Sequence, residues 1–235
     1  LRTLNVKQVY KGGKLVAENG KMLHQKEKNT DWSTEIKERV FHSFHRVPIT
    51  VEELQLKETT GTHQRVIDMV AHELITKERI EEWKELPGVA PGVDISRDIV
   101  KLAAIERHKN TGHVGLGFLG KYGLKKGAVA TSIGHDSHNL VIAGVTDEDM
   151  VLAGNRVIEN GGGLAIALEG KVLADLPLPI GGLMADEPVE VVDEKLEHMK
   201  KLSVELGISE DIDAFMTLAF ISLPVIPKLR LNTYG

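Results

Sequence analysis

The 235-residue sequence contains no cysteine. Disulfide frameworks and thiolate zinc sites are therefore excluded, and with them the zinc nucleobase-deaminase signature that contains a Cys-x-x-Cys element. Aromatic residues make up only 4% of the chain, so the core must be built mainly from valine, isoleucine, leucine and alanine. No apolar run approaches the roughly 20 residues that a membrane-spanning helix needs. These absences predict a protein without membrane spans, and the cytoplasm is the expected compartment.

The charge balance is mildly acidic, with a formal net charge of −5 and a pI near 6.1. This balance argues against a nucleic-acid-binding surface, which needs a concentration of positive charge. Hydrophobic residues make up 42% of the chain, and the length fits one large domain or one domain with a small appendage. Residues 1–6 resemble neither a signal peptide nor a normal initiator, so the sequence reads as though it begins within a longer protein.

Short apolar runs bounded by turn residues predict strands through most of the chain. Asn19-Gly20 lies between two such runs and favours a hairpin, whereas residues 25–47 are polar and are interpreted as a connector. Residues 49–56 favour a strand, although a helix could equally begin at Val51, and the strand favoured over residues 64–75 has a helix as its rival. Further strands are expected at residues 4–10, 99–105, 114–119, 128–133, 140–145, 164–168 and 172–176.

Helical spacing of apolar residues is concentrated in the second half of the chain. A helix is predicted over residues 147–159, with Thr146 as its N-cap and Gly161 at its C-terminal end. Two more helices are expected over residues 189–206 and 214–219. Because strands dominate the middle and helices the end, without regular βαβ alternation, the predicted fold class is α+β, a mixed or antiparallel sheet with helices packed on it.

Six adjacent residues, Gly134-His135-Asp136-Ser137-His138-Asn139, combine two imidazoles, a carboxylate, a hydroxyl and an amide between two strand-like runs. On a loop, both histidines could reach one metal ion, and Asp136 could be a ligand, act as a general base or fix an imidazole tautomer. The alternative is a turn in which Asp136 and Asn139 satisfy backbone groups and the histidines only form hydrogen bonds. One histidine pair with one acid is short of a catalytic metal set, so no metal site is predicted here.

Two further motifs have competing interpretations. Glu106, Arg107 and His108 follow a predicted strand, and their acid and base could form a structural ion pair, which is favoured, or line the same cleft as residues 134–139. Residues 115–120 match the G-x-G-x-x-G pattern of dinucleotide sites, but the glycine-broken residues after them cannot open the helix that such a site needs. These glycines are therefore interpreted as turn and close-packing residues.

Six further motifs of this sequence belong with residues 130–139. They are Glu106-Arg107-His108, Gly161-Gly162-Gly163, Leu176-Pro177-Leu178-Pro179-Ile180, Gly182-Leu183-Met184-Ala185-Asp186-Glu187-Pro188, Phe215-Met216-Thr217-Leu218 and Leu223-Pro224-Val225-Ile226-Pro227. Together they resemble the carboxy-terminal domain of bacterial-type adenine deaminase over roughly residues 48–235. Residues 9–17, with Gly20-Lys21, are similar to the β-hairpin that follows the barrel in the amidohydrolase superfamily.

The resemblance implies two parts: residues 1–47, a remnant of the small amidohydrolase β-sandwich with a connector, and residues 48–235, the α+β domain. In that superfamily a (β/α)₈ barrel holds a pair of divalent metal ions through an H-x-H element and further histidine, glutamate and aspartate ligands. The present sequence contains no H-x-H. It is therefore interpreted as the carboxy-terminal portion of such an enzyme, without the metal-binding barrel, and is expected to be inactive alone.

For the complete enzyme, the resemblance implies hydrolysis of adenine to hypoxanthine and ammonia by a metal-activated hydroxide, with manganese, iron or zinc as the metal. This chain is expected to hold no cofactor itself, to act with its missing barrel domain and to form a homodimer. The candidate catalytic residues, auxiliary to the barrel site, are His135, Asp136 and His138. The candidate substrate-binding residues are Ser137, Asn139, Glu106 and His108.

Two alternatives stay open for residues 134–139 and their domain. The first is a purely structural role, in which the domain supplies dimer contacts and a platform for the barrel. The second is a purine-binding module that does no chemistry. The active-site interpretation is favoured, because a scaffold turn rarely needs two histidines and an acid together.

Overall fold

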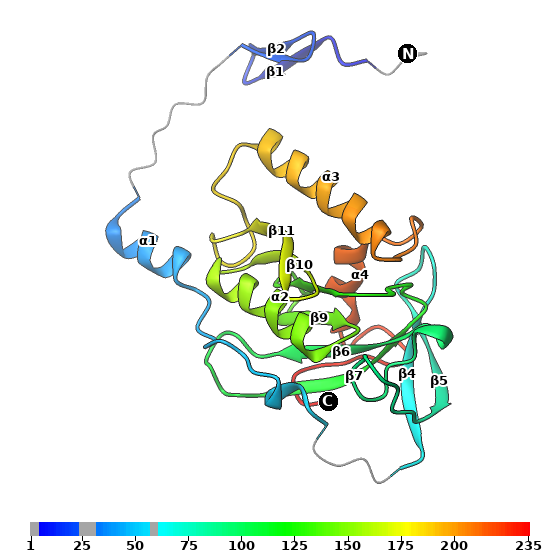
Figure 1. Ribbon diagram of the computed structural model, residues 1–235. Helices are drawn as coiled ribbons and strands as arrows, with labels where there is room; N and C mark the ends of the chain where they lie inside the picture. The colour runs from blue at the N-terminus through cyan, green and yellow to red at the C-terminus, as the bar shows by residue number, and fades with distance from the viewer. Residues whose placement is uncertain (1–4, 24–31, 57–60) are drawn as a thin grey trace. The chain divides into compact units, whose positions relative to one another are not determined.

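The computed structural model describes residues 5–23, 32–56 and 61–235 (Figure 1). The chain forms two compact units, Leu1–Ile36 and Lys37–Gly235. The first contains an antiparallel sheet of β1 (Gln8–Lys11), β2 (Lys14–Glu18) and β3 (Lys21–Met22). Asn19 and Gly20 turn between β2 and β3 with φ of 50° and 77°, as a tight hairpin turn requires, so the predicted hairpin is confirmed. Residue 4 of the predicted first strand and residues 25–31 of the predicted connector lie outside the described residues.

The second unit is built on an eight-stranded sheet in the order β11-β10-β8-β9-β6-β7-β4-β5. Neighbouring strands are antiparallel except for β4 and β7, which pair in parallel. This mixed sheet confirms the predicted α+β class. Its strands are β4 (His63–Met69), β5 (Thr76–Glu82), β6 (Ile99–Ile105), β7 (Val114–Gly120), β8 (Ala128–Thr131), β9 (Leu140–Gly144), β10 (Gly163–Leu168) and β11 (Lys171–Pro177).

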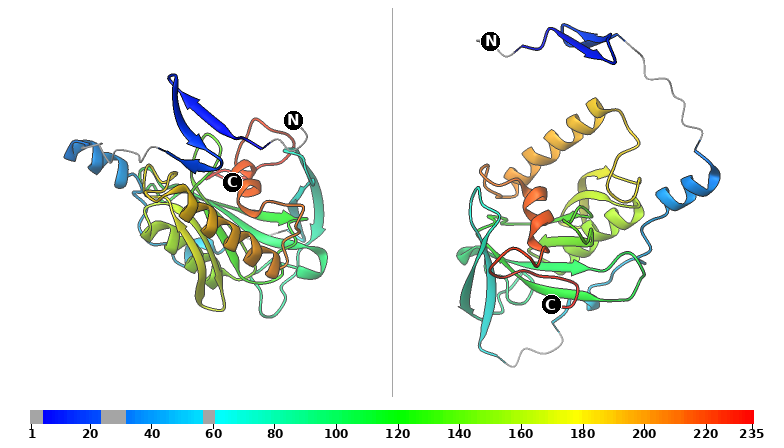
Figure 2. Two further views of the ribbon diagram at one scale, coloured as in Figure 1. Left: turned by 90° about the horizontal axis from the view of Figure 1, so that it is seen from above. Right: turned by 180° about the vertical axis from the view of Figure 1, so that it is seen from behind.

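Helices cover both faces of this sheet (Figure 2). The helices are α1 (Thr34–Phe41), α2 (Asp147–Glu159), α3 (Val189–Glu205) and α4 (Ala214–Ile221), and short 3₁₀ turns lie at Glu52–Leu54 and Ile95–Arg97. Along β6, Leu102 faces the buried cluster that includes α3 and α4, whereas Ala103 faces the cluster that includes α2. No helix in the described ranges is long and apolar enough to cross a membrane.

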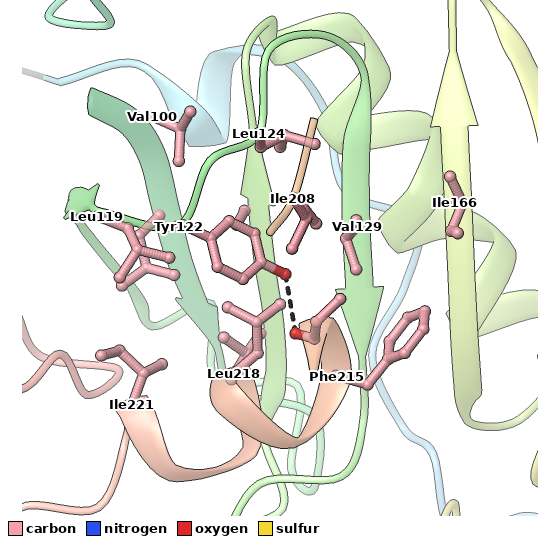
Figure 3. Close-up of a cluster of buried hydrophobic side chains, with 14 of the residues drawn as sticks. Val100, Leu119, Tyr122, Leu124, Val129, Ile166, Ile208, Phe215, Leu218 and Ile221 are labelled. Atoms are coloured by element: carbon pink, nitrogen blue, oxygen red, sulfur yellow. Dashed lines mark hydrogen bonds between the residues drawn. The ribbon is translucent and has the colours of Figure 1, made fainter. Parts of the chain in front are cut away.

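Tyr122, in the connection between β7 and β8, fastens α4 to the sheet. Its side chain is fully buried, and its hydroxyl donates to the carbonyl oxygen of Ala214 at 2.8 Å (Figure 3). Burial holds the pKa of Tyr122 well above its ordinary value, so the phenol stays a donor. Leu218 and Phe215 of α4 pack in the same cluster. Tyr122 therefore also fixes the end of α4 that lies beside residues 134–139.

Three local predictions are corrected by the structure. Residues 49–56 form no strand but the helical alternative, a short turn that begins after Val51, where the Glu53 carboxylate accepts the backbone N–H of Thr50 at 3.1 Å. The strand predicted over residues 64–75 ends at Met69, and the chain turns back at residues 70–75 into β5. The polar connector contains α1, a helix of eight residues with none of them buried, and its few apolar residues were interpreted as isolated anchors.

The G-x-G-x-x-G motif lies within β7 and opens no helix, which confirms the close-packing interpretation. A Cβ atom on Gly115 would lie 1.8 Å from the carbonyl oxygen of Asn232, and one on Gly120 would lie 2.1 Å from the carboxylate of Asp68. The first glycine lets the C-terminal segment lie against β7. The second leaves room for the carboxylate of Asp68 on β4.

We expect Gly115→Ala to destabilise the fold, because the added methyl would collide with backbone that cannot rotate away. Overpacking of this kind costs about 1–3 kcal/mol of unfolding free energy. Gly117→Ala is the matched control, since its Cβ would meet only the Leu231 side chain, at 3.4 Å. Urea denaturation of the two variants is the measurement. Equal losses in the two variants would contradict the packing assigned to Gly115.

Lys101 and Asp147 form a buried ion pair between β6 and α2. Lys101 is 1% exposed, and its Nζ lies 2.7 Å from Oδ1 of Asp147. Lys101→Met should lower the unfolding free energy by about 3–5 kcal/mol, because it leaves a buried carboxylate without its cation. The double variant Lys101→Met/Asp147→Asn should recover much of that loss in the same urea titration. A single-variant loss below about 1 kcal/mol would show that the pair does not act as described.

Candidate functional site

The sheet register brings two distant polar segments together. Ile105, the last residue of β6, lies opposite Leu140, the first residue of β9. The turn Glu106–His108 therefore leaves the sheet beside the segment Gly134–Asn139, which we call the HDSHN loop. His108 Nε2 lies 2.7 Å from the carbonyl oxygen of Ser137 and links the two directly. The pairing brings all seven predicted site residues into one region of the molecule.

The backbone of the HDSHN loop is closed on itself. The N–H of Ser137 donates to the carbonyl oxygen of His135 at 2.9 Å, and that of His138 to Gly134 at 2.7 Å. Asp136 and His138 both have left-handed backbone conformations, with φ of 63° and 45°. Non-glycine residues seldom adopt this conformation, and it costs roughly 1–2 kcal/mol per residue. Contacts with the surrounding elements must therefore maintain the loop.

His135 and Asp136 form an exposed acid–base pair. His135 Nδ1 lies 3.0 Å from Oδ1 of Asp136, and the two side chains are 50% and 70% exposed. The His135 ring stacks on Phe220 of α4 with centroids 5.2 Å apart, and its backbone N–H donates to Ala219 at 2.6 Å. In the tautomer with the proton on Nδ1, held by the carboxylate, Nε2 carries the free lone pair.

His138 is half-buried, and its pKa lies below the ordinary value of a histidine. Burial is the largest influence that lowers its pKa, and the positive charge of Arg107 lowers it further, while Asp136 opposes them. Its Nδ1 is buried without a hydrogen-bond partner among the described residues. The side chain can therefore donate or accept one hydrogen bond as a neutral imidazole.

The remaining loop residues differ from what the simple turn predicts. Asn139 is half-buried, and its Oδ1 has no partner within the described part of the chain. The Asp136 carboxylate pairs with an imidazole rather than with a backbone N–H. Ser137 is exposed, and its hydroxyl is accessible to a ligand. The exposed side chains of the loop are thus those of residues 135–137, whereas Asn139 is partly enclosed and does not close the turn through its Oδ1.

Glu106 is committed to its own turn. Its carboxylate accepts the backbone N–H groups of His108, Lys109 and Thr111 at 2.5, 2.8 and 2.9 Å, and the Thr111 hydroxyl at 3.0 Å. Burial is the largest single influence and would raise the pKa of Glu106, but these hydrogen bonds together lower it to about 2. Glu106 therefore shapes the turn that carries Arg107 and His108.

The structural ion pair favoured for the Glu106–His108 stretch is not formed among the described residues, since the Glu106 carboxylate bonds backbone N–H groups and Arg107 turns into the protein. It is 2% exposed, and its Nε donates to the carbonyl oxygen of His138 at 2.6 Å. Its other contacts are the carbonyl oxygens of Gly181 and Ser43 at 3.1 and 3.4 Å and the ring of Phe44, whose centroid lies 4.9 Å from Cζ. The sequence carries no signal for this arrangement, since the acceptors are main-chain atoms.

A shallow hollow of about 530 Å³ adjoins the turn. Three of its lining side chains are His42, His45 and His108, and the first two were assigned to the connector by sequence. No group of three or more histidine, aspartate or glutamate side chains in the described ranges is placed to hold a metal ion. Taken together, the site can bind, orient and exchange a proton with a polar ligand through His135 and His138.

Comparison with known proteins connects this geometry to a family. The profile described as the adenine deaminase C-terminal domain matches residues 73–235. Adenine deaminase 2 of Carboxydothermus hydrogenoformans is 42% identical over 236 residues, which cover 100% of this chain and 40% of that protein. The adenine deaminases of Lysinibacillus sphaericus and Petrotoga mobilis are 39% and 40% identical, with 100% of this chain and 39% and 40% of each relative covered.

The chain thus spans about two fifths of the length of these curated relatives. The matched range contains the whole sheet from β5 onward, the turn Glu106–His108 and the HDSHN loop. Because the profile covers most of the chain and all of the candidate site, the chain belongs to the adenine deaminase C-terminal domain family.

Proposed function

We propose that this chain is the carboxy-terminal part of an adenine deaminase, an enzyme that hydrolyses adenine to hypoxanthine and ammonia. Two observations support the proposal: the chain belongs to a family named for the C-terminal domain of that enzyme, and it spans only 39–40% of relatives named adenine deaminase. The rest of such a protein would supply a barrel with the reaction centre.

The divalent metal of the complete enzyme would supply an activated water for attack on the purine ring. The described residues of this chain do not fit such an ion. His135 Nδ1 is engaged by Asp136, His138 Nδ1 is buried, and the described histidines and acids form no ligand group. The metal ligands would therefore lie in the rest of the longer protein, and this chain alone should lack deaminase activity.

The HDSHN loop is the part of this chain that we assign to the reaction. The observation that carries the assignment is the exposed His135–Asp136 pair, displayed by a backbone with two left-handed non-glycine residues. Strained conformations of this kind cluster at functional sites, where surrounding structure maintains them. We infer that the loop closes over the barrel mouth and contacts bound adenine. His135 Nε2 would hold or accept a proton there, while His138 and Ser137 would offer hydrogen bonds to ring nitrogens.

Substitution in the complete enzyme tests this assignment. His135→Asn and His138→Asn should each lower kcat/KM by about tenfold or more, because each removes a hydrogen bond to the reacting complex. His63→Asn is the control, since His63 is exposed at the start of β4 and remote from the loop in the sheet order. Losses below about threefold for both loop variants would exclude the active-site role.

A purine titration of the 235-residue chain separates an enzyme part from an independent binding module. Without the barrel, the exposed loop offers only one side of a site, so calorimetry should detect no saturable adenine binding below about 1 mM, an affinity of roughly −4 kcal/mol. An assay for ammonia release with added manganese, iron or zinc should likewise be negative. Submillimolar adenine binding would favour the module instead.

A further inference from the structure

Arg107 is a buried cation without a carboxylate partner in the described part of the chain. Burying a charge is costly unless hydrogen bonds and a counter-charge compensate it. Arg46 of the same unit shows the usual solution. It is 6% exposed, and its guanidinium pairs with the carboxylate of Glu53. Arg107 is the more buried of the two, at 2% exposed, yet it is bonded to carbonyl oxygens. Ion pairing therefore does not explain its burial.

The three carbonyl oxygens come from three separate segments. Ser43 follows α1, His138 belongs to the HDSHN loop, and Gly181 follows β11. The planar guanidinium has donors pointing in several fixed directions, which an ammonium group cannot reproduce. The neighbouring backbone is shaped around it, because a Cβ on Gly182 would lie 2.6 Å from Nη1 of Arg107. The surroundings are thus built to admit a guanidinium.

The contact with the loop is the shortest of the three and falls at a strained residue. Arg107 Nε is 2.6 Å from the carbonyl oxygen of His138, whose φ is 45°. The next residue, His108, holds the preceding loop carbonyl, that of Ser137, at 2.7 Å. Arg107 and His108 therefore bind the carbonyl oxygens of two consecutive loop residues. The charge on Arg107 also contributes, after burial, to lowering the pKa of His138.

We propose that Arg107 is a positioning residue for the HDSHN loop. Its guanidinium holds the His138 carbonyl oxygen against those of Ser43 and Gly181, and this fixes the conformation in which the loop presents His135 and His138. The effect on the loop stands by itself, whereas the effect on catalysis rests on the proposed function. A general core role would instead lower stability without a specific change at the loop.

Nuclear magnetic resonance of the 235-residue chain tests the positioning role without any activity measurement. In Arg107→Lys, amide hydrogen exchange at residues 135–139 should accelerate by about tenfold or more relative to the rest of the sheet. An ammonium group cannot reproduce the fixed donor directions of the guanidinium that hold the loop. His138 should keep its lowered pKa in this variant, since the positive charge remains. In Arg107→Gln the loop should loosen similarly and the pKa of His138 should rise, since the charge is removed.

Arg46→Lys is the matched control, because it alters a second buried arginine, which pairs with Glu53 and not with the loop. It should leave exchange at residues 135–139 unchanged. Unchanged loop exchange in folded Arg107→Lys and Arg107→Gln would overturn the proposal. The wild-type chain provides a second measurement if the variants do not fold: the Nε–H of Arg107 should exchange far more slowly than that of Arg65, which donates to Glu78 at 2.7 Å but is 62% exposed. Equal rates would also overturn it.

Kinetics of the complete enzyme then test the catalytic consequence. Arg107→Lys should lower kcat/KM about tenfold, whereas Arg46→Lys should not. Combined with the double variant His135→Asn/His138→Asn, it should add little further loss, because changes that act through the same groups are not additive. Independent, multiplicative losses would contradict action through the two loop histidines. If neither His135→Asn nor His138→Asn has an effect, the proposed active-site role of the loop fails, and the exchange measurements still decide whether Arg107 positions the loop.

Discussion

The pairing of β6 with β9 is the constraint on which both the core and the candidate site depend. All residues of β6 are buried, and its two faces contact different helices. A slip of one residue would exchange those faces, and it would carry Lys101 away from Asp147. Gly144, opposite Lys101, leaves room for Met150 of α2. The buried charge of Lys101 and the missing side chain of Gly144 thus both favour the register that sets Ile105 opposite Leu140.

The HDSHN loop depends on contacts from outside itself. Its two left-handed residues together cost roughly 2–4 kcal/mol. A hydrogen bond from a charged donor such as Arg107 contributes about 1.5–3 kcal/mol, and neutral bonds such as those to Ser137 and from His135 about 0.5–1.5 kcal/mol each. The two sums are similar in size. The loop conformation is therefore maintained by the turn after β6 and by α4, and removing either support should release it.

The sequence predicted those elements that are defined by their own residues, through apolar spacing and caps. Helix α2 was bounded correctly because Thr146 caps it and Gly161 follows it with a positive φ. Strand β5 was missed because it is an edge strand with alternating charges, and such strands lack an apolar run. The HDSHN loop was recognisable by its side chains. Its partners were not, since Arg107 and His108 hold main-chain oxygens that every residue possesses, and the register that brings them together is a property of the whole sheet.

The choice of carbonyl acceptors for Arg107 has a consequence for the neighbouring imidazole. A carboxylate would hold the guanidinium as firmly, but it would also neutralise its charge and so favour protonation of His138 nearby. Carbonyl oxygens hold the same geometry and leave the positive charge in place. Burial and that charge both lower the pKa of His138 and so favour its neutral form. One buried arginine can thus fix the position of the loop and the protonation state of the residue that the loop presents, and a lysine could supply only the second of these.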